Sequence, residues 1–141
     1  LFPLFFFDHD FKFDSSRIVE ITLKTQNSFG GFGVALNSSA CEDIDSIYIL
    51  INFYSHVPKT LQNKIDTAIK RSLKWILANQ MTDGGFCFKM NQALTFGSKK
   101  MHSKKNQGSM FATWFRLLTL LYITRHLNIE NNLVFTKCPG Y

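Results

Sequence analysis

The stretch QNSFGGFGVALNSSACEDIDSIYIL, residues 26–50, decides the fold. A glutamine is followed by two glycines and a phenylalanine, then by a short polar loop and an acidic cluster that opens an apolar segment. Paired glycines let the backbone turn sharply, and acidic residues in a first turn favour the start of a helix. We therefore expect this stretch to join two helices through a tight corner.

The same pattern occurs a second time along the chain. Residues 20–32, EITLKTQNSFGGF, align with residues 74–86, KWILANQMTDGGF, at an offset of 54 residues. The leucine, the glutamine, both glycines and the phenylalanine coincide, and a buried helix is predicted after each copy. The phenylalanine is expected to fill the seam between helix layers, and the glutamine amide to satisfy backbone groups at the next helix end. Two similar but unrelated helix–turn–helix units are the alternative.

Four helices are predicted. Residues 59–80 carry an apolar stripe at helical spacing with charged residues elsewhere, which indicates a half-exposed helix. Residues 15–26 alternate like a strand, but the serines after Asp14 suit a helix start and the repeated pattern favours a helix. Residues 42–54 and 108–126 have almost no polar face, so both are expected to be buried on all sides, with a buried strand as the rival for the first. Half-exposed and buried helices then alternate, which predicts an all-α protein with an outer and an inner helix layer.

Composition limits the partners and the compartment. The 141 residues suit one domain, and no apolar run reaches the roughly 20 residues of a spanning helix. The three cysteines form no C-x-x-C pair, so free thiols in a reducing, cytoplasmic compartment are expected. The net charge of +6 is scattered and no recognition motif accompanies it, so no nucleic-acid partner is expected. One basic cluster stands apart in a long polar loop, at Lys99, Lys100, Lys104 and Lys105.

The repeated pattern Leu-x-x-Gln-x-x-x-Gly-Gly-Phe resembles the Gln-Trp repeat of the prenyltransferase and squalene-cyclase (terpenoid cyclase) superfamily. Phe32 and Phe86 stand where that family commonly has tryptophan, and Thr113-Trp114 with its leucine-rich run resembles the family's inner helix. The resemblance implies an α/α toroid, a ring of helical hairpins with inner and outer layers. Residues 1–141 would form a single partial toroid domain, with repeat 1 at about 15–56 and repeat 2 at about 59–127. Because about three repeats are needed to bury a continuous core, the remainder of the toroid is expected to be missing from this chain.

The resemblance also suggests a chemistry. Asp43-Ile44-Asp45-Ser46 is similar to the Asp-x-Asp-Asp motif of class II, protonation-initiated terpene cyclases, with Ser46 in place of the last carboxylate. By position, Asp45 would be the general acid that protonates an alkene or epoxide of a polyprenyl substrate. Glu42 and Asp43 would raise the pKa of one carboxyl by like-charge repulsion. The alternative is that these acids only cap the helix and complement its dipole.

The carbocations of such a reaction need aromatic faces and a dry chamber. The side chains expected to supply these faces, or alternatively to form core, are Tyr48, Phe86, Phe111, Trp114 and Phe115. An enzyme of this kind would be an isomerase or lyase that acts on an apolar small molecule, with peripheral membrane contact as an open possibility. The other hypothesis is a non-catalytic toroid module that binds a lipid-linked or polysaccharide ligand.

Zinc is the remaining possibility that the resemblance raises, because protein prenyltransferases hold zinc through Asp, Cys and His. Cys41 and Asp43 lie close together in sequence, and His56 and His102 are present. The Asp-x-Cys order of that family is missing, however, and no clear histidine partner follows. We therefore expect no metal and no other cofactor.

Overall fold

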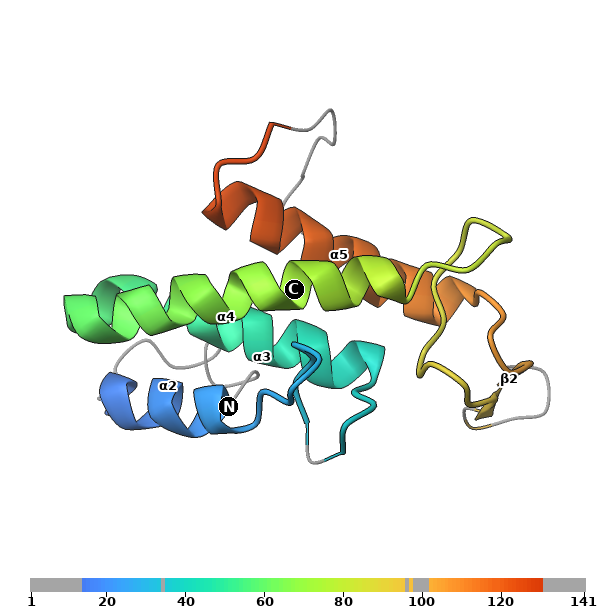
Figure 1. Cartoon of the computed structure of the whole chain (residues 1–141), viewed down its shortest axis with the longest axis horizontal. Coiled ribbons are helices and arrows are strands. Elements are labelled where there is room, and N and C mark those ends of the chain that lie inside the picture. The colour runs from blue at the N-terminus through green and yellow to red at the C-terminus, as the bar shows by residue number, and fades with distance from the viewer. Residues whose placement is uncertain (1–13, 34, 96, 98–101, 131–141) are drawn as a thin grey trace.

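Figure 1 shows the computed structural model of the chain, which describes residues 14–33, 35–95, 97 and 102–130. The helices are α2 (Ser15–Lys24), α3 (Ala40–Asn52), α4 (Lys59–Ala78) and α5 (Met110–His126), with a short 3-10 turn at Tyr54–His56. The predicted all-α class is confirmed for the described residues, including the helix that read partly as a strand. Cys138, Lys99 and Lys100 lie outside the described residues.

The four helices pack around one apolar core. α3 lies against α5, and α4 contacts α2, α3 and α5. In Figure 1, α4 runs along the length of the molecule with α5 on one side and with α2 and α3 on the other. The core draws on every helix, with members such as Val19, Ile47, Ile69 and Ile123.

Local sequence explains where the helices begin. The Asp14 carboxylate accepts the Arg17 N–H at 3.0 Å and so caps α2. Ser39 and Ser109 cap α3 and α5 through their hydroxyl groups, which accept the N–H groups of Glu42 and Ala112. These caps satisfy amides that a helix N-terminus leaves without an intrahelical partner.

The two Gly-Gly-Phe corners, residues 26–32 and 80–86, have the same backbone arrangement. Gln26 forms an antiparallel bridge with Phe32, and Gln80 forms one with Phe86. Both phenylalanines are buried, as expected for side chains that fill the seam between helices. We refer to these segments as the first corner and the second corner.

One glycine in each corner needs its special backbone freedom. Gly30 has φ of 102° and Gly84 has φ of 86°, values that side-chain-bearing residues rarely adopt. α4 lies directly on the first corner, because a Cβ added to Gly30 would be 2.6 Å from the Arg71 carbonyl oxygen. Among residues 14–33, 35–95, 97 and 102–130, no atom lies within 4 Å of the same position at Gly84. The first corner is therefore covered by a helix, and the second corner is open.

The glutamine has a different role from the predicted one. The Gln26 amide donates to the Gly30 carbonyl at 3.0 Å within its own corner and to the Ala68 carbonyl at 2.8 Å in the middle of α4. The prediction that this amide satisfies backbone groups at the end of the following helix is wrong, because the amide contacts the middle of α4. Gln80 keeps the bond within its own corner, to Gly84 at 3.3 Å, and is exposed.

Two further expectations need correction. α5 is not buried on all sides, because Met110, Trp114 and Leu117 are exposed. α3 likewise buries one face, with Ile44 and Ile47 inside, while its opposite face is only partly covered. The polar loop before α5 also contains two short antiparallel strands, β1 (Leu94–Thr95) and β2 (His102–Ser103), which were not predicted.

Candidate functional site

The three acidic residues at the start of α3 lie in three different environments. Glu42 completes a capping box: its carboxylate accepts the Ser39 N–H at 2.7 Å, and its own N–H donates to the Ser39 hydroxyl at 3.2 Å. Lys89 lies 3.9 Å from the same carboxylate. Glu42 thus stabilises the helix end, and it is not paired with another carboxyl.

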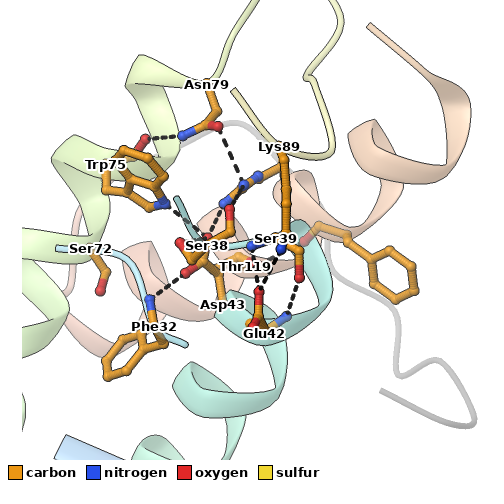
Figure 2. A network of polar contacts seen from close by, with 12 residues as sticks. Phe32, Ser38, Ser39, Glu42, Asp43, Ser72, Trp75, Asn79, Lys89 and Thr119 are labelled. Atoms are coloured by element: carbon orange, nitrogen blue, oxygen red, sulfur yellow. Dashed lines mark hydrogen bonds and ion pairs between the residues drawn. The ribbon is translucent and has the colours of Figure 1, made fainter. Parts of the chain in front are cut away.

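Asp43 is fully buried at the centre of a polar cluster that joins four segments (Figure 2). Its carboxylate accepts the Phe32 N–H at 2.8 Å, the Trp75 indole N–H at 3.0 Å and the Ser38 hydroxyl at 3.1 Å. It also forms an ion pair with the guanidinium of Arg116. These contacts tie the first corner and α3 to α4 and α5. We call Asp43, Ser38, Trp75 and Arg116 the Asp43 cluster.

Burial raises the pKa of the Asp43 carboxyl, and the guanidinium of Arg116 with the Phe32 and Ser38 donors acts in the opposite direction. All four contacts place a hydrogen-bond donor against a carboxylate oxygen. A carboxylate whose oxygens already accept four donors has no open side for a ligand. The geometry therefore makes Asp43 a structural group.

Arg116 is the buried partner that the sequence did not reveal. Its side chain is fully buried, and its second nitrogen Nη2 donates to the Phe88 carbonyl at 3.3 Å and to the Asn79 side-chain oxygen at 3.4 Å. The available signal was an arginine in the middle of the apolar run of α5. Charged residues are almost never fully buried unless they are paired, so an arginine in such a position predicts a buried acid elsewhere in the chain.

Asp45 lies on the side of α3 away from the Asp43 cluster. Residues two positions apart on a helix project in nearly opposite directions, and Asp45 is partly exposed whereas Asp43 is buried. Burial raises the pKa of the Asp45 carboxyl above its usual value. Cys41, one turn earlier on the same side, has its pKa raised to about 11 by burial and by the nearby Asp45 carboxyl. For both groups, burial thus disfavours the charged form.

Aromatic rings also pack along the α3–α5 pair. Tyr48 packs edge-on against Tyr122 of α5, with ring centroids 5.4 Å apart. Phe111 and Phe115 pack edge-on at 4.8 Å. When the N-cap serines of α3 and α5 are aligned, Phe111 and Phe115 take the helix positions of Cys41 and Asp45.

The other two expected aromatic residues lie elsewhere. Phe86 is buried in the second corner at 3% exposure and packs with the core. Trp114 is half exposed on a different side of α5 from Phe115. The structure therefore brings Tyr48, Phe111 and Phe115 to the same helix pair, whereas Phe86 packs in the core.

A cavity of about 510 Å³ lies on another part of the molecule. Phe29, Leu36, Trp75 and Met90 form its apolar wall, with Lys74 among the polar lining residues. Phe29 stacks on Trp75 with ring centroids 6.1 Å apart. Because Trp75 donates its indole N–H to Asp43, this cavity borders the structural cluster and not Asp45.

Among the residues that the structure describes, no three His, Cys, Asp or Glu side chains are grouped so that they could hold a metal ion. None of the described helices has the length and apolar character needed to cross a membrane.

Compared with protein-family models, curated protein sequences and solved structures, the chain gives no significant match in any of the three.

Proposed function

We propose that this chain is a terpene-cyclase-like protein that binds an apolar, polyprenyl-type small molecule against α3 and α5, with Asp45 as the proton donor. In this proposal the two helical hairpins are part of an α/α toroid, and other hairpins complete the ring. The supporting observation is the position of Asp45: a carboxyl with a raised pKa, on the side of α3 that carries Tyr48 and faces away from the Asp43 cluster.

The chemistry requires an acid that keeps its proton in an apolar setting. Protonation of an alkene carbon moves the proton from the Asp45 carboxyl to the substrate and leaves a carbocation and a carboxylate. The cation is stabilised by aromatic faces, and Tyr48, Tyr122 and Phe115 supply rings on the same helix pair. Loss of a proton from another carbon, which returns to the Asp45 carboxylate, then ends the reaction without a net change in composition, which is an isomerisation. No metal or cofactor takes part in these steps.

A second function is favoured by the position of Asp43. The first carboxylate of the motif holds the protein together through Phe32, Trp75 and Arg116, and Ser46 stands in place of the last one. A toroid module without catalysis could retain such an acid for its structural role alone. In that case the α3–α5 face would bind a lipid-linked or polysaccharide ligand and leave it unchanged. For the cyclase and for the non-catalytic module alike, a cytoplasmic location with peripheral membrane contact is compatible with a lipid-linked ligand.

Replacing Asp45 with asparagine separates the two functions. Squalene and geranylgeranyl diphosphate serve as polyprenyl probes, with products followed by gas chromatography and binding followed by quenching of intrinsic fluorescence. If Asp45 is the acid, turnover in Asp45→Asn falls by about 10²–10⁴-fold, since an amide cannot donate that proton, and binding is retained. Because the side chain is partly exposed, stability is expected to change by less than about 1 kcal/mol.

Glu42→Gln is the matched control, because it removes a neighbouring carboxylate from the capping box and leaves Asp45 in place. Turnover that is unchanged in Asp45→Asn contradicts the assignment of the acid. Binding by the parent chain without any product favours the non-catalytic module. Absence of both binding and turnover contradicts the polyprenyl ligand.

A further inference from the structure

The edge of the molecule formed by α5 and the second corner is apolar and open. Leu77 is 51% exposed, Met110 is 87%, Trp114 is 50% and Leu117 is 41%. In the part of the chain that the structure describes, no atom lies within 4 Å of the position that a Cβ of Gly84, in the second corner, would take. We call these residues, with Gln80, the α5 edge.

The matching positions on α3 are buried, which shows what kind of surface the α5 edge is. Ser39 and Ser109 cap their helices in the same way, and the side chains four residues later, Asp43 and Thr113, accept the N–H groups of Phe32 and Phe86 at 2.8 and 2.9 Å. With the two helices aligned on these contacts, three exposed residues of α5 take the places of three residues of α3 that are 0% exposed. The exposed residues are Met110, Trp114 and Leu117, and the buried ones are Ala40, Ile44 and Ile47. This side of α3 is therefore covered, and α5 is the helix that has the most extensive contact with α3.

The outer helices show the same contrast. On the first corner, Arg71 of α4 donates to the Asn27 carbonyl at 3.0 Å and to the Ser28 carbonyl at 3.1 Å. Trp75, one turn later, is 8% exposed and lies over Gly31. The second corner has the same backbone arrangement, but none of the described helices lies on it.

α2 carries the side chains that would fit the second corner. At the offset of 54 residues, Arg17 of α2 corresponds to Arg71 of α4, and Ile21 corresponds to Trp75. Arg17 is exposed, and Ile21 is 54% exposed although it is apolar. We call Arg17 and Ile21 the α2 face.

Where the second corner and α2 differ from the first corner and α4, the differing residues are also compatible with each other. Trp75 donates its indole N–H to the buried Asp43 carboxylate. The second corner has Thr113 in the place of Asp43, and the hydroxyl of Thr113 already accepts the Phe86 N–H. An apolar isoleucine is therefore sufficient in the place of the tryptophan, because the second corner holds no buried charge that needs a donor.

From this complementarity we infer that two copies of this chain associate head to tail, with the α2 face of one copy docked on the α5 edge of the next. The α2 face of the second copy covers the second corner as α4 covers the first. Arg17 of that copy donates to the carbonyls of Met81 and Thr82, the counterparts of Asn27 and Ser28. Because the two surfaces are different, each copy keeps one of them free, and association continues beyond the dimer unless a ring closes.

Mixing two blocked variants of the full chain tests this docking. The first variant, Leu77→Glu with Leu117→Glu, has a charged α5 edge and an intact α2 face. The second, Arg17→Glu with Ile21→Glu, has a charged α2 face and an intact α5 edge. Leu36→Glu is the control, because Leu36 is 62% exposed and belongs to neither surface. Sedimentation velocity over a range of concentrations gives the size of each species, and circular dichroism confirms that each variant is folded.

The parent and the Leu36→Glu control are expected to associate as concentration rises, and each blocked variant alone to require at least a tenfold higher concentration, in keeping with about 1.4 kcal/mol per factor of ten. The mixture of the two blocked variants forms a dimer and nothing larger, since one intact pair of surfaces remains. A parent that stays monomeric, or a mixture that does not associate, overturns the proposal. If a double variant fails to fold, the single substitutions Arg17→Glu and Leu117→Glu are mixed in the same way.

Discussion

Replacing Arg116 with methionine is expected to lower the free energy of unfolding by about 3–5 kcal/mol, because the substitution leaves the charge of Asp43 buried without its partner. The methionine fills much of the same volume, so the loss reports on the charge and on the hydrogen bonds of the guanidinium to Phe88 and Asn79. Both side chains of the pair are fully buried, and Asp43 would keep only its three neutral donors. Urea denaturation followed by circular dichroism measures the change.

Two further variants show whether the ion pair is the cause. Arg125→Met removes an exposed arginine from the same helix and is expected to cost less than about 1 kcal/mol. Asp43→Leu combined with Arg116→Met removes both charges and should recover part of the loss, since a buried pair can often be replaced by apolar residues. Equal losses for Arg116→Met and Arg125→Met would show that the Asp43 cluster does not stabilise the fold.

The second large effect is expected at Gly30. Gly30→Ala and Gly84→Ala both place a side chain at positive φ, which costs about 1–2 kcal/mol. Only at Gly30 does the new Cβ meet the backbone of α4, 2.6 Å from the Arg71 carbonyl oxygen and 2.8 Å from its carbon. That backbone cannot rotate away as a side chain can, so overpacking adds about 1–3 kcal/mol.

Gly84→Ala is thus the matched control for Gly30→Ala, with the same residue change and a similar φ. Thermal and urea denaturation of the two variants give the difference in the free energy of unfolding, which we expect to be about 1–3 kcal/mol. A larger loss for Gly84→Ala, or no difference, would mean that α4 does not cover the first corner.

The helices were predictable because their signals are local. The stripe of apolar residues in α4 and the capping groups Asp14, Ser39 and Ser109 all lie within a few residues of the structure that they determine. The corners were predictable for the same reason, since paired glycines and a phenylalanine specify a turn and its anchor. The short strands β1 and β2 were missed because two-residue strands in a polar loop leave no periodic pattern.

Contacts between distant residues were not predictable from one sequence. The sequence contains Arg116 and Asp43 73 positions apart, and nothing local indicates that they meet. For α5, hydrophobic composition predicted burial on all sides, but exposure depends on which neighbour is present. The described helices cover this side of α3 but not the matching side of α5, so apolar residues at matching positions are buried in α3 and exposed in α5.

The candidate acid illustrates a limit of motif reasoning. Asp43 and Asp45 belong to one short motif, yet the helix sends them in nearly opposite directions, and Glu42 caps the helix end. Helix geometry alone indicates that the two aspartates cannot share one pocket, and this was available from the sequence. The sequence alone does not indicate which of the two aspartates points toward the core.

The two tryptophans of the chain offer the most direct test of the central claim, that the first corner is closed by α4 while the α5 edge is open. The measurement is hydrogen exchange of the two indole N–H groups by nuclear magnetic resonance, in the Arg17→Glu, Ile21→Glu variant so that copies do not associate. We predict that the Trp75 indole exchanges slowly, because it is buried and bound to Asp43, and that the half-exposed Trp114 indole exchanges rapidly. Equal exchange rates, or a protected Trp114 beside a rapidly exchanging Trp75, would contradict the account.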